Sequence, residues 1–261
     1  LDYALAEWLL NEYPYSYIHE ALIFNKIEEL YKTKQYNGQR ISYIKRDTAP
    51  DAAFRDKISS LRLGGFIKPV AHYIDSSSYA IPSKPEYPPE GIVCSIYPFG
   101  YLSHISAMMW HNITHKNPRT VRFTVPSRVA WKKNITELIT SSSSAGNNDV
   151  RMLIPYPSSG KHLGFELEVS QEGKYTDPMK VRGSPIRVSS IAKTFLDMTR
   201  HPFISGGIDH VIDVYEEHGP KFAKQIINFV DKSGTKIDRA RVGFLLKEVA
   251  RISNPRLDIW M

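Results

Sequence analysis

The chain has 261 residues, of which 42% are hydrophobic and 23% are charged, and its net charge is +7. A chain of this size and composition can bury its own core without covalent support. Its only cysteine, Cys94, excludes a disulfide framework and a cysteine-based zinc site, and we expect a buried thiol because it lies in an apolar run. The sequence has no apolar run long enough for a membrane span, so we predict no membrane partner and a cytoplasmic location.

Residues 1–84 are expected to form helices followed by a short hairpin. Apolar residues recur every three or four positions in two early segments, which is typical of helices with one buried face. The first set is Leu5, Trp8 and Leu9, and the second is Ile23, Ile27, Leu30 and Tyr31. Asn37-Gly38 is predicted to end the second helix, and two strands near residues 66–70 and 79–81 complete the block.

A third helix is predicted after Pro50, ending at Gly64-Gly65. Its buried face would carry Phe54, Ile58 and Leu61. Arg55, Ser59 and Arg62 recur at i, i+4 and i+7 and therefore share a different face. Residues 32–68 hold nine basic and three acidic residues, a local net charge of +6.

The order helix, helix, hairpin is that of a winged helix-turn-helix domain, so we predict that residues 1–84 bind double-stranded DNA. Arginine suits phosphates and guanine edges, and a small hydroxyl allows close approach. A solvated surface helix or a protein-interaction module remains the alternative. The predicted DNA-binding residues are Lys45, Arg46, Arg55, Lys57, Ser59, Arg62, Lys68 and His72.

Residues 90–188 are expected to combine helix and strands after a proline-rich linker at 82–89. Ser103 would cap a helix, and residues 119–126 alternate as a strand. His104, His111 and His115 are interpreted as surface or capping histidines, because their spacing does not suit a metal site.

A second strand, residues 163–169, places Glu166 and Glu168 on one face. Two carboxylates could hold a divalent cation, which leaves a metal-dependent nuclease as an alternative function. The lysine that such a site would need two residues further on is missing. We therefore favour a solvated face or an ion pair with Arg122 or Arg151.

Residues 189–261 are expected to be helical. A helix with Ala192, Phe195 and Leu196 on one face ends at His201-Pro202, and Gly206-Gly207 begins the next one. Further helices are predicted at 208–217, 220–231 and 237–251. Asp197 is expected to accept hydrogen bonds from backbone amides or from Arg200.

Three segments together resemble the AbiEi family of antitoxins from type IV toxin–antitoxin systems. They are residues 189–214, the run Tyr101-Leu102-Ser103-His104 with the strand after it, and Gly243-Phe244-Leu245-Leu246. The resemblance covers most of residues 95–250. It marks Tyr101, Ser103, Asp197, Gly206 and Gly207 as family-motif residues that shape the fold or the antitoxin activity.

The resemblance implies an α+β protein with two domains, a winged helix-turn-helix at 1–84 and an antitoxin domain at 90–261. Such a protein represses its own operon by binding inverted repeats, with self-association on DNA. It also counteracts a nucleotidyltransferase-type toxin without a stable complex. We expect no cofactor, no metal and no enzymatic activity, since no catalytic motif is evident. A DNA-binding regulator without a toxin partner remains an alternative.

Overall fold

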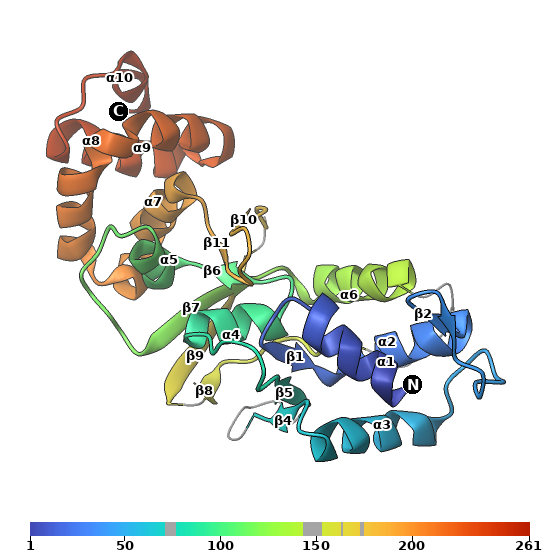
Figure 1. Ribbon diagram of the computed structural model, residues 1–261. Helices are drawn as coiled ribbons and strands as arrows, with labels where there is room; N and C mark the ends of the chain where they lie inside the picture. Colours follow the sequence, from blue (N-terminus) through green and yellow to red (C-terminus); the bar gives the residue numbers. More distant parts are fainter. Residues whose placement is uncertain (71–76, 143–152, 163, 173–174) are drawn as a thin grey trace.

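The computed structural model describes residues 1–70, 77–142, 153–162, 164–172 and 175–261. The first block of the chain is largely helical and ends in a small sheet (Figure 1). Its elements are α1 (Asp2–Glu7), η1 (Trp8–Glu12), β1 (Tyr17–His19), α2 (Glu20–Thr33), β2 (Gln35–Tyr36), β3 (Gln39–Arg40), α3 (Asp51–Leu63), β4 (Lys68–Pro69) and β5 (Ser78–Ala80).

The amphipathic patterns of this block are confirmed. Ile23, Ile27 and Leu30 are buried on α2, and Phe54, Ile58 and Leu61 are buried on α3. The predicted end of α2 at Asn37-Gly38 is wrong, because the helix already ends at Thr33 with Lys34 in the left-handed conformation. Asn37 and Gly38 instead turn the β2–β3 hairpin, where both have positive φ.

The small sheet is antiparallel and has the order β1-β5-β4. Ile18 lies opposite Tyr79, and Lys68 lies opposite Ala80. The strand that precedes α2 is thus paired with the second strand of the hairpin that comes after α3. This pairing joins the two ends of the first block.

The middle of the chain forms a six-stranded mixed sheet with the order β10-β11-β6-β7-β9-β8. β7 and β9 are parallel and are connected through α6, which Figure 1 shows alongside the first block. The elements are α4 (Pro89–Ile96), β6 (Tyr101–Leu102), α5 (His104–Trp110), β7 (Thr120–Val125), α6 (Arg128–Ser142), β8 (Gly160–His162), β9 (Phe165–Gln171), β10 (Met179–Lys180) and β11 (Arg187–Val188).

The last part of the chain is helical, as predicted. It contains α7 (Ile191–Arg200), η3 (Pro202–Ser205), α8 (Ile208–Ser233), α9 (Lys236–Phe244), η4 (Leu245–Val249) and α10 (Pro255–Trp260). The prediction of separate helices at 208–217 and 220–231 is wrong, because α8 continues through Pro220. An internal proline costs about 3 kcal/mol, and packing of α8 against η4 offsets this cost. A Cβ on Gly219 would lie 3.2 Å from Cβ of Ala250, so this glycine permits the close contact.

Two hydrophobic cores hold the molecule together. The larger one joins side chains of the first block, such as Leu5 and Ile23, to side chains of the six-stranded sheet, such as Phe123 and Leu167. The smaller one joins α5 to the C-terminal helices through residues such as Met108, Phe195 and Tyr215. Buried side chains from before and after the proline-rich segment at 82–89 belong to one core. A domain boundary at this segment stays a prediction.

The fold is a mixture of helices and strands with a helical C-terminal part. None of the helices in the described ranges has both the length and the apolar character that a bilayer crossing requires. Cys94 is buried on α4, as expected, and burial raises the pKa of its thiol.

Candidate functional site

The outer face of α3 carries the predicted cationic stripe. Arg55, Ser59 and Arg62 are exposed. The buried residues of the same helix are Ala53, Phe54, Ile58 and Leu61. Within the described ranges, neither Arg55 nor Arg62 takes part in an ion pair. Two guanidinium groups on this face are therefore free to contact an external partner.

Lys57 on the same helix is already engaged. Its Nζ lies 2.7 Å from Oδ2 of Asp2, so the ion pair joins α3 to α1. Burial acts to raise the pKa of Asp2, but hydrogen bonds from Lys57 and Ser60 outweigh it and hold the pKa below its usual value. Lys57 is thus placed at a contact between helices.

The remaining predicted DNA-binding residues flank α3. Lys45 and Arg46 are exposed in the irregular segment 41–50 that leads into α3. Lys34 donates to the carbonyl oxygen of Lys45 at 3.4 Å and pairs with Asp47 at 2.6 Å, which ties this segment to the end of α2. Lys68 is exposed on β4. His72 lies outside the described residues.

A second polar region lies around α7 and includes three residues that the sequence analysis singled out, Tyr101, Ser103 and Asp197. Lys193 of α7 is buried, and its Nζ lies 2.8 and 3.0 Å from the two carboxylate oxygens of Asp197. The same Nζ lies 2.8 Å from Oε1 of Glu172, whose Oε2 accepts a hydrogen bond from the Tyr101 hydroxyl at 2.7 Å. One ammonium thus links two carboxylates.

The hydrogen-bond partner of Asp197 differs from the one predicted. It pairs with Lys193, whereas Arg200 donates to both carboxylate oxygens of Asp238 on α9, at 3.0 and 2.7 Å. Residues four positions apart are neighbours on a helix, so Lys193 lies beside Asp197 and supplies its hydrogen bonds. Burial raises the pKa of Asp197 to about 6, against the opposing effect of Lys193.

The prediction of surface or capping histidines is wrong for His104, which is only 6% exposed. Its backbone has a φ of +49°, which is rare outside glycine. Its Nδ1 lies 2.9 Å from Oγ of Ser103, and that oxygen accepts from the hydroxyl of Thr124 at 2.8 Å. Burial, followed by the nearby charges of His201, Lys193 and Arg122, lowers the pKa of His104 to about 3.

Several of these groups line a pocket of about 310 Å³. The described residues that line it are His104, Thr124, Ser170, Gln171, Glu172, Lys193, Asp197, Arg200, His201 and Ile204. The sequence analysis singled out His104 and Asp197 but not Lys193 or Glu172. The i, i+4 spacing of Lys193 and Asp197 is a sequence signal for their ion pair, although the same spacing is typical of an exposed helix.

Gly206 and Gly207 reverse the chain between η3 and α8. Both have positive φ, 101° and 99°, and α8 begins at the next residue as predicted. A Cβ on Gly206 would lie 2.6 Å from the ring of His210, so a larger residue would not fit. These two glycines therefore shape the turn beside the pocket.

The two carboxylates considered for a nuclease lie near the guanidinium of Arg122. Glu168 pairs with Arg122, which is one of the two partners expected, while Glu166 is exposed. The part of the chain that the structure describes holds no group of three His, Cys, Asp or Glu side chains placed to bind a metal ion. His111 is half-buried, and its Nε2 contacts the carbonyl oxygen of Ser189 at 2.8 Å.

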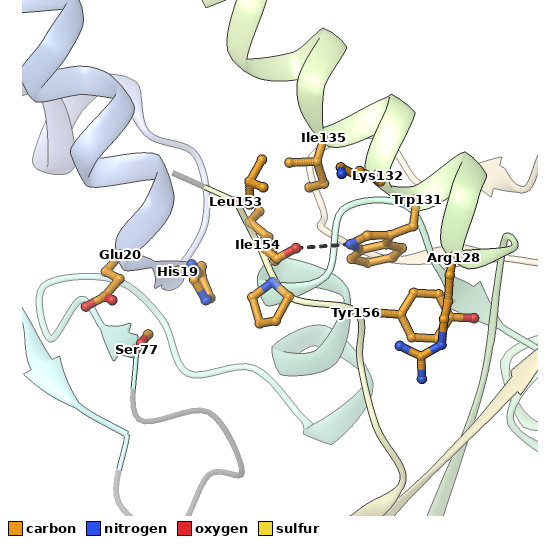
Figure 2. A pocket seen from close by; sticks show the side chains of 11 residues that line it. His19, Glu20, Ser77, Arg128, Trp131, Lys132, Ile135, Leu153, Ile154 and Tyr156 are labelled. Carbon is orange, nitrogen blue, oxygen red and sulfur yellow. Dashed lines mark hydrogen bonds between the residues drawn. The ribbon is translucent and has the colours of Figure 1, made fainter. Parts of the chain in front are cut away.

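A larger hollow of about 510 Å³ lies between α6 and the start of α2 (Figure 2). Trp131 lines it and donates to the carbonyl oxygen of Ile154 at 3.0 Å, and the guanidinium of Arg128 lies 4.4 Å from the ring of Tyr156. Ser77 and Leu153 also line it, and each is the first described residue after a gap. The described residues therefore do not define its full outline.

Comparison with known proteins adds no family assignment. No protein-family model matches the chain, and no curated protein matches it. A function for the chain must therefore be inferred from the geometry of α3 and of the pocket.

Proposed function

We propose that this chain is a DNA-binding transcriptional regulator whose first block is a winged helix-turn-helix domain. The observation that carries the proposal is the exposed Arg55–Ser59–Arg62 face of α3, directly before the β4–β5 hairpin. The sheet order β1-β5-β4 supports it, because a winged helix pairs its first strand with the last strand of its wing.

The stripe on α3 matches the dimensions of DNA. A helix rises about 1.5 Å per residue, so Arg55 and Arg62 are separated by about 10 Å along the axis. That length corresponds to about three base-pair steps of 3.4 Å. The major groove admits an α-helix, and arginine can contact guanine edges or phosphates from it.

The antitoxin half of the proposal rests on the resemblance to the AbiEi family. In that proposal the protein represses its own operon at inverted repeats, with self-association on DNA. Residues 90–261 would counteract a nucleotidyltransferase-type toxin without forming a stable complex. A neighbouring reading frame for such a toxin would favour this role over that of a regulator without a toxin.

The test is a mobility-shift experiment with the full chain and its own upstream DNA. Random DNA of equal length serves as the reference, and both are measured over a salt series. We expect preferential binding to the upstream DNA that weakens steeply with salt, because several phosphates lose their counterions. Equal, weak binding to both DNAs would contradict the proposal.

A further inference from the structure

The side chain of His104 has one nitrogen with no partner among the described residues. This nitrogen, Nε2, is buried, and the residue, which is only 6% exposed, lines the 310 Å³ pocket. Leaving a buried polar group without a hydrogen bond destabilises the fold. A binding partner in the pocket would remove this destabilisation.

The neighbouring hydroxyls are compatible with a proton on Nε2. Thr124 donates its hydroxyl hydrogen to Ser103, which leaves Ser103 its own hydrogen to donate to Nδ1 of His104, 2.9 Å away. The pKa of His104, lowered to about 3 by burial, keeps the ring neutral at pH 7. With Nδ1 as the acceptor, the hydrogen of the neutral ring is on Nε2, and this is the tautomer that we expect. In this tautomer the pocket is lined by an N–H donor that has no acceptor among the described residues.

The lining also offers a further donor and further acceptors. Arg200 uses Nε and Nη2 for Asp238, and its Nη1 makes no hydrogen bond within the described ranges. Each oxygen of Glu172 accepts one hydrogen bond, from Lys193 or Tyr101. Each keeps further accepting capacity, because a carboxylate has about four lone-pair sites.

The charges around the pocket favour an uncharged ligand. Among the lining residues, Lys193 and Arg200 are the cations, and Glu172 and Asp197 are the carboxylates. Two cations against two carboxylates leave no net charge, which favours an uncharged ligand over an ion. We propose that the pocket binds a small uncharged molecule through an amide-type edge, with its carbonyl oxygen facing His104 and Arg200 and its N–H facing Glu172.

An amide-type edge occurs on nucleobases and on carboxamides, so the probes are uridine and propionamide, with inorganic phosphate as the charged comparison. Protein labelled with ¹⁵N histidine is titrated and followed by NMR. We expect the free protein to show the Nε2–H form of His104, and we expect at least one amide probe to shift its signals in a saturable manner. Binding of uridine but not of propionamide would identify the ligand as a nucleobase. Binding of propionamide alone would identify it as a carboxamide.

His104→Asn is the informative variant, because asparagine tolerates positive φ and retains a polar group near Ser103 but does not reach the pocket. We expect it to weaken amide binding about tenfold, as loss of a buried hydrogen bond does. His115→Asn makes the same change at an exposed position and should bind as the unaltered protein does.

Four results would each overturn the inference. They are an Nδ1–H form of His104, no saturable shift with either amide probe, unchanged affinity in His104→Asn, and tighter binding of phosphate than of both amides. The first two are measured on the unaltered protein, so the test does not depend on the variant folding. None of them depends on DNA binding by α3.

Discussion

The outer face of α3 and the pocket beside α7 use charged side chains in opposite ways. On α3, Arg55 and Arg62 are exposed and form no ion pair within the described ranges. At the pocket, Lys193 is buried and shared between Asp197 and Glu172. Exposed charges add little to stability, so those on α3 are suited to a partner. Buried charges must be paired, and the contacts of Lys193 with two carboxylates meet that requirement.

The largest expected effect is on stability. Lys193→Met removes the cation between Asp197 and Glu172 and leaves buried carboxylates without compensation, so we expect a loss of about 3–5 kcal/mol in the free energy of unfolding. Chemical denaturation would measure it. Lys132→Met, an exposed lysine on α6, is the control and should change stability by less than about 0.5 kcal/mol. Equal losses in the free energy of unfolding would contradict the difference that we infer between buried and exposed charges.

The second expected effect is a loss of DNA affinity without a loss of stability. The double variant Arg55→Ala and Arg62→Ala should lower affinity for the upstream DNA by about 100-fold, since each arginine contact contributes about 1–3 kcal/mol. Its stability should stay within about 0.5 kcal/mol, because both side chains are exposed. Arg241→Ala with Lys224→Ala removes the same charge from exposed positions on α9 and α8 and serves as the control. Similar losses in both double variants would show that net charge, and not the α3 face, binds the DNA.

The smallest effect is a dependence on pH. His104 has a pKa of about 3 in the folded chain and about 6.5 when unfolded. The unfolded state therefore binds a proton that the folded state does not, and stability is lost as pH falls from 6.5 toward 3. Asp197 acts in the opposite sense, because its pKa is raised to about 6 in the folded chain. Its contribution to stability is lost as pH rises through that value.

His104→Asn separates these two contributions. Between pH 6.5 and pH 5 the unaltered chain should lose about 2 kcal/mol more than the variant, at about 1.4 kcal/mol per pKa unit. Thermal and chemical unfolding at several pH values would measure the difference. Parallel pH profiles would mean that burial does not depress the pKa of His104.

The sequence by itself determined the elements whose signals are local. Phe54, Ile58 and Leu61 repeat with the period of a helix, so their burial and the exposure of Arg55, Ser59 and Arg62 follow from spacing alone. The reversal at Gly206-Gly207 was predictable for the same reason, since only glycine accepts such φ angles readily. The long-range pairing of β1 with β5 has no such local signal.

Tertiary structure alone decided the pocket. It brings together Ser103-His104, Thr124, residues 170–172 and residues 193–201, which are distant in the chain. It also carried α8 through Pro220, because packing against η4 offsets the local preference for a break. Whether a lysine or histidine is exposed or buried depends on what packs over it, and side-chain spacing along one helix does not contain that information.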